Sequence, residues 1–130
     1  MEETRSPPKV LLADDSMYMR HLLKTMLNGR FKVVGEAPDG HAAIELYKKI
    51  KPDIVIMDIT MPNVCGITAV KSIRDTDPNA LIIMCSAINQ EWQVKEALRY
   101  GAMDFVVKPF SKDRILQALE RTMMSKKITA

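Results

Sequence analysis

The chain has 130 residues, of which 47% are hydrophobic and 27% are charged, the composition of an ordinary soluble domain. No apolar run approaches the roughly 18 residues that a membrane span needs, and residues 1–5 lack the apolar core of a signal peptide. The sequence therefore predicts a cytoplasmic protein with no membrane partner, in which Cys65 and Cys85 are reduced thiols.

The net charge of +3 arises near the C-terminus. Residues 1–89 carry 11 basic and 11 acidic side chains, whereas residues 90–130 carry 8 basic and 5 acidic ones. Nucleic-acid-binding domains usually show a denser basic patch, so we expect no nucleic-acid partner. This excess of positive charge is compatible with an acidic peptide partner or with an ordinary solvated surface. The sequence alone does not decide between the two.

Strand and helix signals alternate along the whole chain. Short runs rich in Val and Ile are typical of strands that are buried on both faces, and apolar residues at spacings of three and four are typical of amphipathic helices. Lys32 and Glu36 mark the second strand as an exposed edge. In chain order the sequence predicts strand 10–13, helix 19–27, strand 31–37, helix 43–50, strand 54–57, helix 67–74, strand 81–84 continuing to Ser86, helix 94–98, strand 105–107 and helix 115–123.

This alternation predicts an α/β fold of the (βα)5 type. Strands that are joined by single helices require right-handed crossovers, so the five strands form a parallel, doubly wound sheet with helices on both faces. The helical pattern ends near Met124. We therefore expect an N-terminal extension over 1–8, one domain over 9–124, and a short tail over 125–130 with no output domain.

Three acidic positions and one lysine follow predicted strands directly. Asp14 and Asp15 follow the first strand, Asp58 follows the third, and Lys108 follows the fifth. Because the carboxyl ends of parallel strands meet at one edge of the sheet, these side chains should converge there, where open α/β sheets bind their ligands. Clustered carboxylates repel one another unless a cation lies among them, so the arrangement predicts a site for a hard divalent metal such as Mg²⁺.

Four short motifs resemble those of a known family. Each motif alone is weak evidence, but all four occur in order, each at the end of a predicted strand. The motifs are Ala13-Asp14-Asp15-Ser16, Met57-Asp58-Ile59-Thr60-Met61-Pro62 with Gly66 beyond it, Cys85-Ser86-Ala87, and Val107-Lys108-Pro109-Phe110. With them the chain resembles the receiver domains of bacterial two-component response regulators, and among these the single-domain chemotaxis regulators of the CheY type. The resemblance covers roughly residues 9–124 and implies a flavodoxin-like, CheY-like sheet with strand order 2-1-3-4-5.

The resemblance implies a role for each acidic residue. Asp58 would be the nucleophile that accepts a phosphoryl group as an aspartyl phosphate. Asp15 and Asp58 would bind Mg²⁺ directly, Asp14 would act through a bound water, and the backbone carbonyl of Thr60 would be a further oxygen ligand. An alternative for Asp15 is that it only helps Ser16 to cap the following helix.

Three further residues would bind the phosphoryl group or respond to it. Lys108 would place its charge against the phosphoryl oxygens, and Ser86 would donate its hydroxyl to one of them. Phe105 lies at the family's switch position. Because Phe lacks a phenolic oxygen, an outward rotamer cannot be held by a hydroxyl hydrogen bond, so the inward state should be easy to reach. The alternatives are a surface lysine at 108 and an ordinary turn residue at Ser86.

The predicted function is that of a stand-alone, monomeric response regulator. A sensor histidine kinase would phosphorylate Asp58, and the face made by the fourth helix, the fifth strand and the last helix would then bind a target, with the flagellar motor switch favoured. A phosphorelay intermediate and a phosphate sink stay open. An Asp-nucleophile phosphatase is disfavoured, because such enzymes commonly have a second Asp where this chain has Thr60. A binding module that works without phosphorylation is disfavoured because no acidic residue or lysine is missing.

The chain would not be an enzyme on a separate substrate. It would only phosphorylate itself and lose the phosphoryl group slowly, although a phosphatase could act on it. The two family positions that flank the path of the attacking water correspond to Thr60 and Ile88. Thr60 is short and Ile88 can neither hydrogen-bond nor act as a base, so we expect slow hydrolysis.

Overall fold

The computed structural model describes residues 6–87 and 90–129. Ten elements alternate along the chain, and they are β1 (Lys9–Ala13), α1 (Met17–Leu27), β2 (Lys32–Ala37), α2 (Gly40–Ile50), β3 (Ile54–Met57), α3 (Gly66–Thr76), β4 (Ile82–Ser86), α4 (Glu91–Arg99), β5 (Asp104–Val107) and α5 (Lys112–Thr129). The five strands form one parallel sheet in the order β2-β1-β3-β4-β5. This confirms the predicted fold class and strand order.

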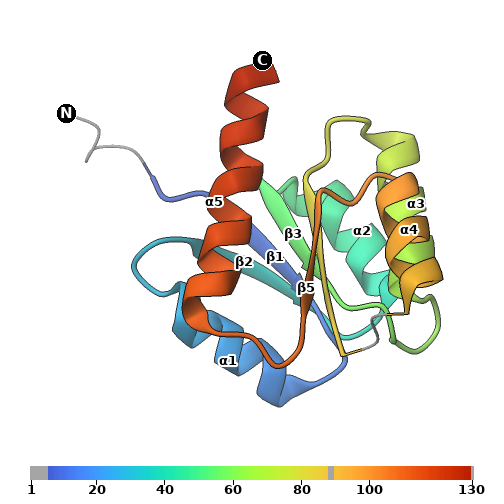
Figure 1. The fold of residues 1–130 in the computed structure, drawn as a ribbon, viewed down its shortest axis with the longest axis horizontal. Coiled ribbons are helices and arrows are strands. Elements are labelled where there is room, and N and C mark those ends of the chain that lie inside the picture. The colour runs from blue at the N-terminus through green and yellow to red at the C-terminus, as the bar shows by residue number, and fades with distance from the viewer. Residues whose placement is uncertain (1–5, 88–89, 130) are drawn as a thin grey trace.

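The sheet is the middle of three layers. Helices α1 and α5 cover one face, and α2, α3 and α4 cover the other (Figure 1). Two apolar clusters fill the spaces between the layers, one centred on Leu23, Leu27 and Ile115 and the other on Tyr47, Val70 and Met84. Strands β3 and β4 are buried along their whole length, as their continuous apolar sequences predict for strands with helices on both faces.

The helices that pack closely on the sheet match their predicted stripes, and α4 does not. Val94, Ala97 and Leu98 have the spacing of one helical face, but Leu98 is 45% exposed whereas Ala97 is fully buried. The physical reason is that α4 lies near the β5 edge of the sheet, where a helix buries only a narrow stripe. None of the helices in the described part of the chain is long and apolar enough to cross a membrane.

The last helix is longer than predicted. The sequence places its end near Met124 and treats 125–130 as a tail, but α5 continues to Thr129. The apolar stripe ends at Met123, which is half-buried. A helix can continue beyond the end of its apolar stripe, and the lysines that follow are good helix formers.

The second strand is an edge strand, as Lys32 and Glu36 indicated. The Glu36 carboxylate accepts from Arg20 Nε at 3.0 Å and from Lys24 Nζ at 2.8 Å, both on α1. These contacts, led by the hydrogen bond from Lys24, lower the pKa of Glu36. Charged side chains along an exposed edge oppose pairing with a strand of another molecule.

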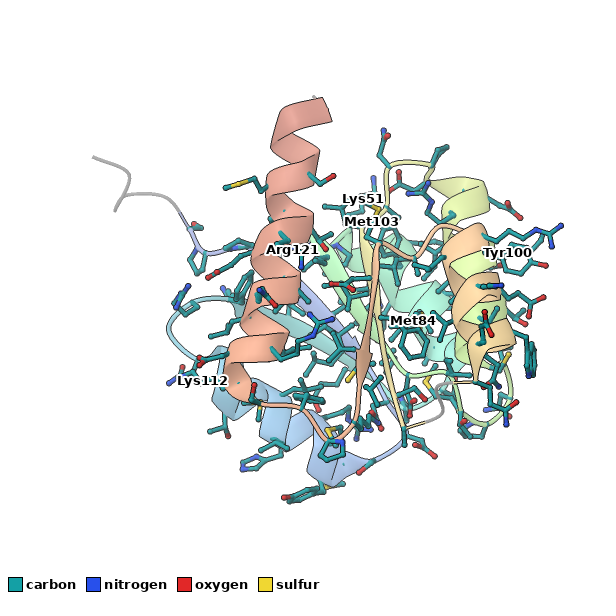
Figure 2. All side chains as sticks on the ribbon, in the orientation of Figure 1. Lys51, Met84, Tyr100, Met103, Lys112 and Arg121 are labelled. Carbon is teal, nitrogen blue, oxygen red and sulfur yellow. The ribbon has the colours of Figure 1, made fainter. Side chains whose placement is uncertain are left out.

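The carboxyl ends of the strands define one end of the molecule. Lys51 and Met103, which precede β3 and β5, lie at the opposite end, while Lys112, the first residue of α5, lies near the carboxyl ends (Figure 2). All five loops that follow strands therefore open at the same end. This is the end at which the sequence predicts the acidic site.

Gly66 begins α3 in close contact with the end of β3. Its N–H donates to the Ile59 carbonyl at 2.7 Å, and a Cβ at this position would lie 1.8 Å from the Asp58 carbonyl oxygen. Backbone atoms cannot move aside as the end of a side chain can. Only glycine therefore allows α3 to start where it does, directly behind Asp58.

We expect Gly66→Ala to lower the free energy of unfolding by about 1–3 kcal/mol, because the added methyl group must displace backbone. Urea denaturation of the two proteins measures the difference. Gly35→Ala in β2 is the matched control, since its Cβ would meet the side-chain ends of Ile50 and Leu11 rather than backbone. Equal losses in the two variants would contradict this account of Gly66.

Candidate functional site

The backbone of the site continues the sheet by one hydrogen bond beyond β1, β3 and β5. The N–H of Asp14 donates to the Ala37 carbonyl at 3.0 Å, the N–H of Asp58 to Ala13 at 2.9 Å, and the N–H of Lys108 to Ser86 at 3.0 Å. Each acceptor is the last residue of the neighbouring strand. Asp14, Asp58 and Lys108 are thus held in register by the sheet itself, although they lie far apart in the sequence.

The side chains of these three residues meet at the sheet edge. Lys108 Nζ lies 2.8 Å from Asp14 Oδ2 and 3.4 Å from Asp58 Oδ2. Asp14 is 3% exposed and Asp58 is 7% exposed, so both carboxylates are largely withdrawn from water. Lys108 also precedes Pro109 through a cis peptide bond. The predicted convergence of carboxylates and lysine is therefore present.

The charges at this edge are coupled. Burial raises the pKa of Asp58, and the Asp14 carboxylate raises it further, while the Lys108 charge and the Ser86 hydroxyl act in the opposite direction. Burial lowers the pKa of Lys108, but its bond to Asp14 and the charge of Asp58 outweigh this and raise it. Asp58 thus lies where an additional positive charge would strongly favour its ionised form.

A third carboxylate completes an oxygen-rich group. Ligand atoms of Asp14, Asp15 and Asp58 all lie within 4.8 Å of one another, and Asp15 is the exposed member. Oxygen donors at this spacing suit a hard divalent cation such as Mg²⁺. Helix α1 is capped by Ser16, whose Oγ accepts from the Met19 N–H at 3.1 Å. The cap therefore does not need Asp15, whose side chain faces solvent.

The remaining predicted residues surround this group. Ser86 is buried at the end of β4 and its hydroxyl bonds to Asp58. Thr60 is exposed in the loop between β3 and α3. Phe105 is half-buried and packs against the apolar cluster that contains Tyr47, Val70 and Met84. Ile88 lies outside the described residues, so the role predicted for it stays a prediction.

Sequence reasoning missed two sets of contacts around the site. Asn63 Nδ2 donates to Asp39 Oδ2 at 2.9 Å and so joins the loop after β3 to the start of α2. Arg114 Nη2 on α5 donates to the Phe105 carbonyl at 3.3 Å. No spacing rule predicts contacts between side chains on different loops.

Comparison with known proteins identifies the family. The model of the response regulator receiver domain matches residues 10–120. The chain is 50% identical over 114 residues to the chemotaxis protein CheY of Thermotoga maritima, covering 87% of this chain and 95% of that one. It is also 50% identical over 117 residues to CheY of Bacillus subtilis, covering 88% and 97%.

A solved structure shows the same fold. The CheX–CheY–BeF3–Mg²⁺ complex of Borrelia burgdorferi contains a chain that is 37% identical, with a TM-score of 0.88 and coverage of 93% of this chain and 92% of that one. Fold, motifs and identity over most of the length agree with the acidic edge described above. The chain belongs to the response regulator receiver domain family and is a response regulator of the CheY type.

Proposed function

We propose that this protein is a phosphorylation-controlled switch of chemotaxis whose phosphoryl acceptor is Asp58. The observation that carries the proposal is the geometry at the sheet edge, where one buried carboxylate lies within reach of a lysine, a second buried carboxylate and a hydroxyl. The identity to CheY proteins supports chemotaxis as the process. We propose a histidine kinase as the phosphoryl donor.

Asp58 acts as the nucleophile in this proposal. Its carboxylate oxygen forms a bond to phosphorus, while the bond from phosphorus to the donor nitrogen breaks and its electron pair stays on the imidazole. Lys108 already lies 3.4 Å from Asp58 Oδ2 and is placed to stabilise negative charge on the phosphoryl oxygens. Ser86, at the end of the neighbouring strand, supplies a hydroxyl donor for one of them.

We propose that Asp14, Asp15, Asp58 and the Thr60 carbonyl hold Mg²⁺, with Asp14 acting through water. When bound, this ion supplies positive charge that neutralises the carboxylates and the incoming phosphoryl group. The spacing of the three carboxylates supports the assignment, as does the presence of Mg²⁺ in the Borrelia complex. The raised pKa of Asp58 supports the same assignment, because a further cation beside this buried carboxylate would favour its ionised form.

The output surface is the face formed by α4, β5 and α5. Four large apolar residues are exposed in α4 and in and beside β5, namely Trp92, Leu98, Met103 and Val107. Basic side chains on the same elements, including Arg99 and Arg121, are exposed nearby. We propose that phosphorylation draws Ser86 toward the phosphoryl group, fixes Phe105 inward, and adjusts this face for a target such as the flagellar motor switch.

A phosphatase with Asp58 as nucleophile receives no support from the site. The position two residues after the nucleophile is Thr60, which has no carboxylate to protonate a leaving group or activate water. The three acidic residues of the cluster are the ones proposed to hold Mg²⁺. The arrangement therefore suits a long-lived aspartyl phosphate better than rapid turnover of an external substrate.

Incubation with acetyl phosphate and Mg²⁺ should add one phosphoryl group that is stable to acid and labile to base. Asp58→Asn should abolish its formation, because the amide is not a nucleophile of comparable strength. Intact-protein mass spectrometry measures the added mass. Equal labelling of the variant would contradict the assignment of Asp58.

Magnesium should bind weakly, since few protein ligands are available and several water molecules stay on the ion. Asp15→Ala should raise the dissociation constant at least tenfold, about 1.4 kcal/mol at 25 °C, because one carboxylate is lost. Isothermal titration calorimetry measures the constant. Glu45→Ala on the exposed side of α2 is the control and should bind as the parent does. Parental affinity in Asp15→Ala would place the metal elsewhere.

Addition of BeF3, which accompanies Mg²⁺ in the Borrelia complex, should shift amide resonances throughout α4, β5 and α5. The expected cause is reorganisation around Ser86 and Phe105. Two-dimensional NMR spectra record the shifts, and Asp58→Asn provides the unmodified control. Shifts that are confined to the loops after β1, β3 and β4 would show that no switch reaches the proposed output face.

A further inference from the structure

We propose that the hydrogen bond between Asn63 and Asp39 positions the loop of residues 59–65, and that it thereby sets the affinity of the acidic site for Mg²⁺. The two residues are positioning residues, since neither belongs to the acidic group itself. The inference deepens the proposed function, because it rests on Thr60 of this loop contributing a carbonyl ligand.

Asn63 is the strained point of the loop. Its φ of 68° lies in the left-handed region, which non-glycine residues adopt uncommonly and Asn tolerates better than most. In this conformation its side-chain amide reaches across to α2 and donates to Asp39 Oδ2 at 2.9 Å. The strained backbone is thus associated with a specific contact to a different element.

Asp39 is itself a fixed acceptor. Its other carboxylate oxygen accepts from the Ala42 N–H at 2.8 Å, so the residue caps α2 with one oxygen and holds the loop with the other. The Ala42 N–H, followed by the Asn63 side chain, lowers the pKa of Asp39, so the acceptor stays ionised. A charged acceptor forms a stronger hydrogen bond than a neutral one.

The loop and α2 also lie in direct contact beside this bond. A Cβ on Gly40, the first residue of α2, would lie 2.0 Å from the Val64 carbonyl oxygen. The loop is closed on itself as well, by Val64 N–H to the Pro62 carbonyl at 2.8 Å and by Gly66 N–H to the Ile59 carbonyl at 2.7 Å. These contacts restrain the loop backbone together with the Asn63 hydrogen bond.

The position of Thr60 depends on the loop backbone more than the positions of its neighbours do. Ile59 and Met61 are buried and hold one side of the loop, but the Thr60 side chain is exposed and contributes no packing of its own. The place of its carbonyl is therefore set by the loop backbone. Without the Asn63 contact the carbonyl would sample more positions, and ordering it on a bound ion would cost affinity.

Four variants test the proposal in Mg²⁺ titrations at about 0.15 M ionic strength, where the effect of a lost charge is screened. Asn63→Gly removes the donor and suits the left-handed backbone. Asp39→Ser keeps a capping oxygen for α2 but is too short to reach Asn63. The double variant Asp39→Asn with Asn63→Asp exchanges donor and acceptor at constant charge. Asn79→Gly, in the turn after α3, is the matched control.

Asn63→Gly and Asp39→Ser should each raise the Mg²⁺ dissociation constant about three- to tenfold, the range expected for one hydrogen bond. The exchange variant and Asn79→Gly should remain within about twofold of the parent, which is below that range. A parental constant in Asn63→Gly would overturn the proposal, and so would an exchange variant as weak as Asn63→Gly. A contact that merely stabilised the fold would lower the free energy of unfolding in urea and leave the dissociation constant of the folded protein unchanged.

A second measurement does not depend on the metal. In Mg²⁺-free protein, the amides of Val64 and Gly66 should exchange with solvent faster in Asn63→Gly than in the parent and in Asn79→Gly, because the loop is less restrained. Equal exchange rates would contradict the positioning role. If the parent itself failed to bind Mg²⁺, the proposed function would fail, whereas normal binding by the parent and all variants would refute only the role of the Asn63–Asp39 pair.

Discussion

The arrangement of this molecule depends on one ammonium group held between two buried carboxylates. Asp14 and Asp58 repel each other at the end of the sheet, and burial strengthens that repulsion because little water is present to screen it. Lys108, which follows a third strand, offsets this repulsion with its positive charge. The ion cluster can form only if β1 and β3 are neighbours and β5 ends on the same side of the sheet. The contact between these charges therefore depends on the strand order.

The site combines a rigid base with adjustable surroundings. Asp14, Asp58 and Lys108 continue the hydrogen-bond ladder of the sheet, so their relative positions are fixed. The parts around them are less confined: Asp15 and Thr60 are exposed, and α4 buries little apolar surface beside the site. A switch needs both properties, because the reacting groups must be placed accurately while the surface that reports their state must have more than one arrangement.

Much of this could be predicted from the sequence, and the reasons are specific. Strand ends and parallel topology placed Asp14, Asp58 and Lys108 together, since both follow from local apolar patterns. The exposure of Leu98 could not be predicted, because a helical stripe does not reveal how far a helix overlaps the edge of its sheet. The Asn63–Asp39 contact was missed because a left-handed residue and a side chain on another loop leave no periodic signal. The end of α5 was misplaced because a helix can continue beyond the end of its apolar stripe.

The residues of the site are far apart in the sequence, and this affects how the site forms during folding. The Lys108–Asp14 contact joins residues that are 94 positions apart, and the two strands between β1 and β5 in the sheet must be paired before it can form. Contacts between distant residues are slow to form, because closing a long loop costs entropy before any contact compensates for it. The first three strands assemble all three carboxylates without their lysine. Until β5 pairs with β4, the three carboxylates therefore lack Lys108, and the pairing of β5 completes both the sheet and the charge balance of the site.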